Sequence, residues 1–381
     1  MFISGLWITG FTSLRAVDWQ PARLNVLIGP NGSGKSNLLR ALDLIATSAA
    51  GNLRDFILRK GGFPRLQWGE STEPITFNVV TGTAEQIYEV ELSPMPGSAS
   101  FRVSSESLAF PAPAAPGTHL FLRAGGHLEL LQGDRMEVPY PASEIPHDET
   151  VLSMVTALWS HPAPYEFQQY LRSWAIYHDL RVDEHAGIRR SAIKREERRV
   201  SRDGQNLTAV LDTLYAGEFK ETIDNAMSAA FPGDYEELIL RPAEPDRIQL
   251  YLRRKHGARQ DSAADLSDGT LRFLLLLTIL ASPDPPPLIA IDEPEGGLHP
   301  SMLPIIAEFA NAAATRTQVI LSTHSPQMLD AFGEDLPAAT IFNWVEDQTE
   351  LKIIAGEELK KWVDEYSLGR FIFSGEAAAV L

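Results

Sequence analysis

The sequence predicts an α/β fold in which a parallel sheet is built from both ends of the chain and interrupted by a long insertion. Three observations support this prediction. Apolar strands and helical segments alternate up to about residue 46 and again from Leu266 onward. Alternating residues broken by Pro and Gly fill residues 71–140, which is typical of antiparallel strands. Residues 148–231 have helical spacing and more charge.

Composition limits the compartment and the partners. The chain has 381 residues, no cysteine and a formal net charge of −17. Without cysteine, disulfides and thiolate zinc sites are excluded. The N-terminus lacks the basic and apolar regions of a signal peptide, and the longest apolar run, Phe273–Leu280, is far shorter than a membrane span. We therefore expect a cytoplasmic protein with no membrane partner, whose surface does not coat nucleic acid indiscriminately.

The individual elements follow from local patterns. Three β-prone runs open the chain, and a helix is expected over Asn37–Ala46. The antiparallel region contains four strands, and a flexible loop is expected over residues 111–117. Two further runs are expected to pair with each other. The expected strands are 3–8, 14–19 and 24–28, then 75–80, 86–92, 101–105 and 127–131, and then 235–242 with 247–254.

A glycine-rich segment between the third strand and the first helix matches the pattern of a phosphate-binding loop, G-x-x-x-x-G-K-[ST]. Its glycines let backbone N–H groups curl around a phosphate, and the following helix start adds a positive dipole end. Lys35 would reach the β- and γ-phosphates, and the Ser36 hydroxyl would bind Mg²⁺. The residues expected to bind nucleotide are Gly29, Asn31, Gly32, Ser33, Gly34, Lys35 and Ser36.

An apolar run, Leu288–Ile291, ends in two carboxylates, Asp292 and Glu293. An isolated match of this kind can be a solvated acidic turn. Beside a phosphate loop, however, the two carboxylates are expected to have distinct roles: Asp292 would hold Mg²⁺, and Glu293 would polarise the attacking water. The sequence therefore predicts an ATP site with Mg²⁺ at this strand end.

Two more segments follow in an informative order. Ser267 and Asp268 are good N-cap residues for an apolar helix, and Ser267 with Gly269 can also form a second phosphate-binding end. His324 follows a β-prone run, a position that is more often structural than catalytic when it occurs alone.

The order of these segments resembles the ABC ATPase superfamily, and their details resemble its RecF/SMC/Rad50 and OLD-like branch, in particular the stand-alone bacterial ATPases of the AAA family. The resemblance is carried by IGPNGSGKSNLLRAL, LSDGTLRFL, IDEPEGGLHP and LSTHSPQML, by GFTSLRAV near the start and by YSLGRF near the end. It covers roughly residues 1–60 and 262–370, with a looser match at 203–215. It implies an ABC-type P-loop ATPase head with an antiparallel β subdomain and an inserted helical subdomain.

The resemblance also implies roles and boundaries. Glu293 would be the general base and His324 the switch histidine at the γ-phosphate. Ser267 and Gly269 would contact the γ-phosphate held by the other subunit, so that a homodimer completes each ATP site. We expect the head to comprise residues 1–147 and 233–381, with the helical insert at 148–232.

Three positions depart from the pattern of the branch. His299 occupies the place where many ABC proteins have a D-loop aspartate, as is usual in OLD-like proteins. Thr12 stands where related heads have an arginine, and Arg15 is the nearby substitute. Gln67 is the best candidate for the Q-loop glutamine.

Residues 189–202 form a basic segment that we expect on a helix. It contains seven cations and two anions. A solvated helix face is the ordinary interpretation. The alternative is binding of DNA, RNA or a partner, because the segment inverts the sign of the chain's net charge. No aromatic residue is interleaved, which argues against base stacking.

We thus predict a dimeric ATP-hydrolysing switch that acts in DNA repair or anti-phage defence, by engaging nucleic acid or controlling an effector. A nucleotide-binding subunit of an ABC transporter would have a shorter chain and a Leu-Ser-Gly-Gly-Gln signature. A third hypothesis is a nucleotide-binding regulatory or scaffold protein with negligible ATP turnover. No Asp-x-Asp element occurs in the chain, and only about 55 residues follow His324, so any nuclease or other effector is expected to be a separate polypeptide.

Overall fold

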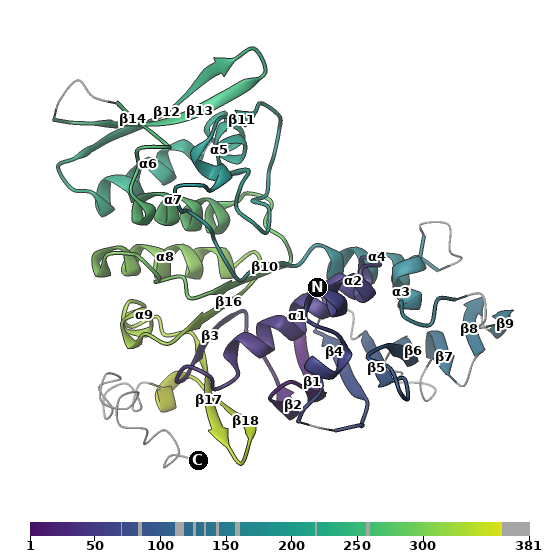
Figure 1. Ribbon diagram of the computed structural model, residues 1–381. Coiled ribbons are helices and arrows are strands. Elements are labelled where there is room, and N and C mark those ends of the chain that lie inside the picture. Colours follow the sequence, from purple (N-terminus) through teal and green to yellow (C-terminus); the bar gives the residue numbers. More distant parts are fainter. Residues whose placement is uncertain are drawn as a thin grey trace.

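The computed structural model of the chain describes residues 1–69, 71–82, 86–110, 118–124, 127–132, 135–141, 145–156, 161–217, 219–256 and 260–359. A six-stranded sheet with the order β10-β15-β16-β3-β17-β18 lies at its centre (Figure 1). Its first five strands are parallel and β18 is antiparallel, which confirms the parallel sheet predicted from the two ends of the chain. The strands are β3 (Leu24–Ile28), β10 (Ala175–Tyr177), β15 (Leu288–Asp292), β16 (Gln318–Thr323), β17 (Ala338–Val345) and β18 (Gln348–Ile354).

Each face of the central sheet packs against its own hydrophobic cluster, because successive side chains of a strand point to opposite faces. Val26 and Ile291 belong to the first cluster, whereas Leu27 and Ala290 belong to the second. The helices of the first cluster are α5 (Leu207–Tyr215), α6 (Phe219–Ala230), α7 (Asp268–Ala281), α8 (Leu303–Ala314) and α9 (Pro326–Asp330). The helices of the second cluster are α1 (Lys35–Ala49), α2 (Leu53–Arg59), α3 (Val151–Met154) and α4 (Ala163–Arg172).

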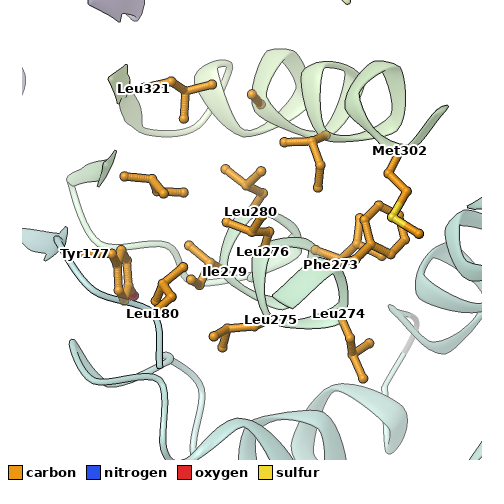
Figure 2. Packing of buried hydrophobic residues seen from close by; sticks show 14 of the residues in the cluster. Tyr177, Leu180, Phe273, Leu274, Leu275, Leu276, Ile279, Leu280, Met302 and Leu321 are labelled. Atoms are coloured by element: carbon orange, nitrogen blue, oxygen red, sulfur yellow. The ribbon is translucent and has the colours of Figure 1, made fainter. Parts of the chain in front are cut away.

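Helix α7 is apolar on all sides, as expected for a helix buried on all sides. It contacts α8 on one side and α5 and α6 on the other, so these helices form successive layers over the sheet (Figure 1). Figure 2 shows Phe273, Leu276 and Leu280 of this helix packed among neighbouring apolar side chains. The buried helix predicted from the run of leucines is therefore confirmed, and its N-terminus is held in a fixed place above the sheet.

An eight-stranded antiparallel sheet, ordered β2-β1-β4-β5-β6-β7-β8-β9, adjoins the second cluster. It confirms the predicted antiparallel region and adds two strands that the sequence did not indicate, β7 and β9. The expected loop over residues 111–117 lies outside the described residues. The strands are β1 (Ile3–Phe11), β2 (Leu14–Trp19), β4 (Ile75–Thr81), β5 (Ile87–Pro94), β6 (Phe101–Phe110), β7 (Thr118–Ala124), β8 (His127–Gln132) and β9 (Arg135–Pro141).

A third, smaller sheet lies beyond α5 and α6 (Figure 1). Its two long strands pair as predicted, with Leu240 opposite Leu250. The four strands are β11 (Ala192–Ile193), β12 (Tyr235–Glu244), β13 (Arg247–Arg254) and β14 (Gln260–Ser262). The short 3-10 turns within the described residues are η1 (Phe63–Arg65), η3 (Gly187–Arg189) and η4 (Pro300–Met302).

The helix expected over residues 189–202 is wrong. This segment runs from η3 through the short strand β11 and continues as irregular chain. Its backbone groups bond to distant partners instead of to each other: Lys194 N donates to Asp246 O at 2.8 Å, and Tyr177 Oη donates to Val200 O at 2.9 Å. Because tertiary hydrogen bonds replace helical ones, the charge pattern alone misled the prediction. The predicted division of the chain at residues 147 and 232 stays a prediction; Ala175–Tyr177, from between these points, forms the edge strand β10.

Candidate functional site

The carboxyl ends of three neighbouring parallel strands meet at one edge of the central sheet. In the register of these strands, Asp292 at the end of β15 lies opposite Ser322, and Thr323 at the end of β16 lies opposite Ile28 at the end of β3. Residues that directly follow these ends therefore gather at the same edge, which is where parallel α/β sheets bind ligands. The predicted phosphate loop, the two carboxylates and His324 come from these three ends.

The phosphate loop connects β3 to α1 and is closed by its own lysine. Lys35 is buried, and its Nζ donates to Gly29 O at 2.7 Å and Pro30 O at 3.0 Å. Burial lowers the pKa of Lys35, and the nearby carboxylates of the acidic edge, which favour the charged form, act in the opposite direction. Gly32 and Gly34 have φ values of 82° and 106°, which other residues rarely adopt. The loop thus has the backbone that its glycine pattern predicts.

Hydrogen bonds from two segments that are distant in the sequence hold this loop in place, and sequence reasoning did not identify these segments. Thr349 Oγ1 donates to Ser33 O at 2.9 Å and lies 2.7 Å from Ser13 Oγ. Asn37 Nδ2 donates to the same Ser13 oxygen at 2.8 Å. A Cβ atom at Gly34 would lie 2.0 Å from Thr349 Oγ1. The β1–β2 turn and the β17–β18 hairpin therefore fix the loop, and no sequence signal distinguishes Ser13 or Thr349 from ordinary turn residues.

The groups of the loop fit a bound triphosphate. Within the part of the chain that the structure describes, the hydroxyls of Ser33 and Ser322 are buried without a hydrogen-bond partner. Buried hydroxyls are normally satisfied, so a ligand oxygen or water at this edge would complete them. Ser36 is exposed and Asp292 half-buried, and a hydroxyl with a carboxylate is the donor set that Mg²⁺ takes beside phosphate oxygens.

Glu293 and His324 face each other at the sheet edge. Glu293 Oε1 lies 3.1 Å from His324 Nδ1, and both side chains remain about half exposed. The backbone N of Glu293 donates to Ser322 O at 2.8 Å, and its φ of 49° lies in the left-handed region. Such strained backbone persists where the surrounding structure imposes it and is common at functional sites. The carboxylate is thus held at the edge of the loop and still open to solvent.

A second carboxylate and an arginine, both missed by sequence reasoning, lie behind this pair. Glu295 is nearly buried and accepts a hydrogen bond from Thr323 Oγ1, and burial raises the pKa of Glu295. Arg272, from the first turns of α7, donates to Glu293 O at 2.7 Å, and burial lowers the pKa of Arg272. The only signal for these residues is closeness in sequence: Glu295 follows Glu293 by two positions, and Arg272 follows Ser267 by five.

Ser267 and Gly269 form the start of α7. The Ser267 side chain caps the helix by accepting from Thr270 N at 3.2 Å. A Cβ at Gly269 would lie 2.8 Å from Gly297 O, so the helix start packs closely on the loop that follows Glu293. Among the described residues, no hydrogen bond joins Ser267 or Gly269 to the phosphate loop. One chain therefore brings Lys35, Asp292, Glu293 and His324 together, whereas in the described residues the Ser267–Gly269 turn is not hydrogen-bonded to the phosphate loop and Ser267 is exposed.

The remaining candidate residues that the structure describes, Gln67, Arg15 and His299, each contact residues close to them in space. Gln67 Nε2 donates to Ser71 O and Glu73 O, and the guanidinium of Arg15 lies 4.5 Å over the Trp68 ring. His299 Nδ1 caps η4 by accepting from Ser301 N. The predicted YSLGRF motif, residues 366–371, lies outside the described residues.

The basic segment is less available than its sequence suggested. Arg189 is buried rather than exposed. Four other arginines of the segment are ion-paired: Arg195 with Glu197, Arg198 with Glu196, Arg199 with Asp284, and Arg202 with Asp43. In the described residues, the charge available to a nucleic acid is therefore smaller than seven cations imply, and binding of DNA or RNA through this segment stays a prediction.

Comparison with known structures supports the fold. The head of an SMC protein bound to the C-winged helix domain of ScpA superposes with a TM-score of 0.51 at 15% identity, over 95% of this chain and all of that one. An SMC head with an extended coiled coil, bound to the C-terminal domain of ScpA derived from Pyrococcus furiosus, gives 0.50 at 14% identity, over 96% of this chain and 99% of that one. At such low identity the likeness concerns the fold alone. No curated protein matches the chain.

In the part of the chain that the structure describes, no helix has the length and apolar character needed to cross a membrane. A family model with the description "AAA domain, putative AbiEii toxin, Type IV TA system" matches residues 24–99 and 150–330, which together make up more than half of the chain. This match includes the phosphate loop, the acidic strand end and His324. The chain therefore belongs to that family of AAA-domain proteins, and its fold is that of an SMC-type P-loop ATPase head.

Proposed function

We propose that this protein binds and hydrolyses ATP as a homodimeric switch. The observation that carries the proposal is the sheet edge where the Lys35 loop, Asp292, and the facing Glu293–His324 pair meet, with the Glu293 carboxylate open to solvent. A closed loop for phosphates next to a solvent-facing carboxylate is the arrangement that phosphoryl transfer to water requires.

In the proposed reaction, the loop N–H groups and Lys35 bind the β- and γ-phosphates of ATP. Mg²⁺, held by Ser36 and Asp292, would neutralise charge on the phosphate oxygens. Glu293 accepts a proton from the attacking water, whose oxygen bonds to the γ-phosphorus as the bond to the β–γ bridging oxygen breaks, releasing ADP and phosphate. His324, whose Nδ1 lies 3.1 Å from Glu293 Oε1, orients that carboxylate and contacts the γ-phosphate through its other nitrogen.

The exposed Ser267–Gly269 turn supplies the argument for a dimer. It has a capped helix start with N–H groups free to meet an anion, yet in the described residues no hydrogen bond joins it to the phosphate loop of its own chain. We infer that it binds the γ-phosphate held by the partner subunit. Each composite ATP site would then form only when two chains meet, which makes ATP the signal for dimerisation and hydrolysis the signal for release.

We further propose a cytoplasmic role in DNA repair or anti-phage defence, exerted on a separate effector or nuclease protein. The family description, which refers to a toxin of a type IV toxin–antitoxin system, and the SMC heads crystallised with ScpA domains both support control of a second protein. The two alternatives remain open to direct tests: a transporter subunit would co-purify with membranes, and a scaffold would bind ATP without turnover.

The experiment uses Glu293→Gln, Lys35→Ala and, as a matched control, Glu308→Gln, which alters an exposed carboxylate on α8. Glu293→Gln should bind Mg·ATP but hydrolyse it about 10²–10⁴-fold more slowly, because a general base is lost. It should accumulate as an ATP-dependent dimer in size-exclusion chromatography with light scattering and retain nucleotide after gel filtration. Lys35→Ala should neither bind ATP nor dimerise. Turnover by Glu293→Gln at the parental rate would overturn the mechanism.

A further inference from the structure

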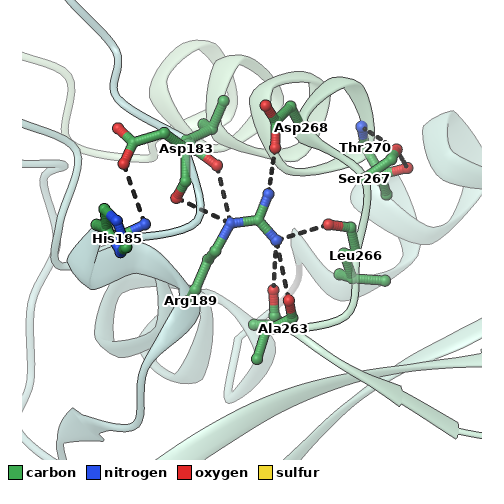
Figure 3. Close-up of polar contacts among 10 residues, drawn as sticks. Asp183, His185, Arg189, Ala263, Leu266, Ser267, Asp268 and Thr270 are labelled. Carbon is green, nitrogen blue, oxygen red and sulfur yellow. Dashed lines mark hydrogen bonds and ion pairs between the residues drawn. The ribbon is translucent and has the colours of Figure 1, made fainter.

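Arg189 forms an unusually dense set of contacts next to the Ser267–Gly269 turn (Figure 3). Its side chain is only 8% exposed. Nε donates to Val182 O at 2.9 Å and Asp183 O at 3.0 Å. Nη1 donates to Leu266 O at 2.6 Å and to the carbonyls of residues 263 and 264. Nη2 donates to the carboxylate of Asp268. One guanidinium thus joins a loop of the insertion to the segment that leads into α7.

The contacts of Arg189 hold a cation close to the N-terminus of α7. The N-terminus of a helix carries a positive partial charge, so a cation beside it is unfavourable unless other groups hold it there. Here five backbone carbonyls surround the guanidinium, and three of them belong to the approach to α7. A buried arginine is stable only when its donors are satisfied, so the carbonyls of this approach are fixed in position by Arg189.

Asp268 supplies the second reason for the contact. This residue lies between Ser267 and Gly269, at the same helix start that would receive a phosphate, and its side chain is 66% exposed. A carboxylate at that place repels an incoming anion. The ion pair with Arg189 both neutralises the carboxylate and draws it toward the buried guanidinium, away from Ser267 (Figure 3).

We propose that Arg189 is a positioning residue of the composite ATP site: it fixes the turn that receives the partner's γ-phosphate and neutralises Asp268 within that turn. The inference rests on the proposed function, because the turn acts only across a dimer. Arg189 would act on the nucleotide of the other subunit without touching it, through the carbonyls and the carboxylate that it holds.

The first experiment compares Arg189→Met with Arg190→Met, a matched change at the next residue, which is exposed. Arg189→Met should bind ATP as tightly as the parent, because the phosphate loop is intact, while ATP-dependent dimerisation and the kcat for hydrolysis fall about tenfold or more. Arg190→Met should behave as the parent. Adding Asp268→Asn to Arg189→Met should recover part of the dimerisation by removing the uncompensated charge, which a purely structural role would not predict. Parental dimerisation and kcat in Arg189→Met would overturn the proposal, as would the absence of any recovery.

Arg189→Lys keeps the result interpretable if the methionine variant fails to fold. Lysine retains the charge but reaches fewer carbonyls, so this variant should fold and show intermediate dimerisation and turnover. If the methionine variant fails to fold, the lysine variant can still fold and match the parent in dimerisation and kcat. That result would contradict the proposal that the several N–H donors of the Arg189 guanidinium are needed to hold these carbonyls.

The second experiment mixes variants to separate this inference from the proposed function. A subunit with Lys35→Ala has an intact turn, and a subunit with Arg189→Met has an intact phosphate loop, so a mixed dimer contains one complete site and should hydrolyse ATP faster than either variant alone. The reference mixture pairs Lys35→Ala with Ser267→Arg. If the reference mixture shows no recovery, the composite site itself is wrong. If it recovers and the Arg189→Met mixture does not, only the role of Arg189 is contradicted.

Discussion

The starts of α1 and α7 are both proposed to bind phosphate, yet they are built in different ways. Helix α1 begins at Lys35 after Gly34, whose φ is 106°, and no side chain caps it. The lysine that closes its loop, Lys35, is buried and reaches back only five and six residues. Helix α7 begins after the exposed Ser267, which caps it, and the approach to it is held by Arg189 from 79 residues away in sequence.

This difference follows from what each start is proposed to do. A loop that encloses phosphates needs glycines and a nearby cation, and both are local properties of a short sequence. A turn that meets the nucleotide of a partner must stay exposed, so its shape has to be maintained by groups behind it. In this protein Arg189 supplies such support, and it belongs to the segment that the sequence predicts as an insertion; we propose that this segment thereby acts on the composite site.

The far ends of the two helices differ as well. At α1, Thr150 Oγ1 donates to Ser48 O, and the adjoining turn donates from Val151 N and Leu152 N to the buried carboxylate of Glu106. At α7, the guanidinium of Arg316 donates to Ser282 O and Leu280 O. A cation at a helix C-terminus is favourable. At α1 the supporting group is instead a buried carboxyl group, whose pKa burial raises to about 7.

The largest effect on stability is expected for Gly34→Ala, which breaks the start of α1. We expect the free energy of unfolding to fall by about 4 kcal/mol, because a side chain at this φ is strained and the new Cβ collides with Thr349. Gly32→Ala is the control, since its φ is also positive but no described heavy atom lies within 4 Å of a Cβ there. Its cost should be about 1 kcal/mol. Urea denaturation measures both, and equal losses would show that Thr349 does not confine the loop.

The second-largest effect is a pH dependence of the free energy of unfolding, caused by Glu106 near the C-terminal end of α1. Burial raises the pKa of Glu106 from 4.5 to about 7, against hydrogen bonds from Val151 N, Leu152 N and Tyr88 and the charge of Arg123, which lower it. Because the pKa is higher in the folded state, this contribution to stability is complete below pH 4.5 and is lost as the pH rises to about 7. The loss amounts to about 3 kcal/mol.

Glu106→Gln should remove that part of the pH dependence, as measured by urea denaturation at pH 5 and pH 8. Glu308→Gln, at an exposed carboxylate, should leave the pH dependence as in the parent. If Glu106→Gln retains the full decline in stability between these pH values, another group causes the decline. The C-terminal ends of α1 and α7 would then not differ in their sensitivity to pH.

A smaller effect is expected at the start of α7. Ser267→Ala removes the hydroxyl that accepts from Thr270 N and should lower the free energy of unfolding by about 1 kcal/mol. Ser325→Ala is a matched control, because Ser325 precedes α9 without capping it and the loss should be about 0.5 kcal/mol or less. ATP affinity per subunit should not change in Ser267→Ala, whereas it is lost in Lys35→Ala. Isothermal titration calorimetry compares the two, and an equal loss would contradict the separation of the two helix starts.

The smallest effect on the fold is expected for charge reversal in the basic segment. Arg198 and Arg199 pair with exposed carboxylates, and the exposed Arg195 pairs with Glu197, whose side chain is 17% exposed. Surface pairs of this kind contribute about 0–1 kcal/mol each. Reversing all three to Glu should leave basal ATPase activity intact and abolish any DNA binding, which we expect to be weak and strongly salt-dependent in the parent. Fluorescence anisotropy at several salt concentrations measures this. Unchanged DNA binding would show that the segment is a solvated face, unlike the buried Arg189 that begins it.

Several features of the molecule follow from the sequence by itself. The phosphate loop, the apolar strands and the all-round apolar helix α7 are recognisable because their defining contacts span only a few residues or depend on simple periodicity. The parallel sheet also follows, since strand–helix alternation leaves few ways to bury both faces. These elements bring Lys35, Asp292, Glu293 and His324 to one edge.

Only the tertiary structure decided the supports of these elements. The contact of Ser13 with Thr349 spans 336 residues, and that of Arg189 with Asp268 spans 79. A run of charges has the same sequence pattern whether it lies on a solvated helix or, as here, in an irregular segment with one arginine buried. The physical reason is that burial of a charge depends on which carbonyls the fold brings to it, and these come from segments that are distant along the chain.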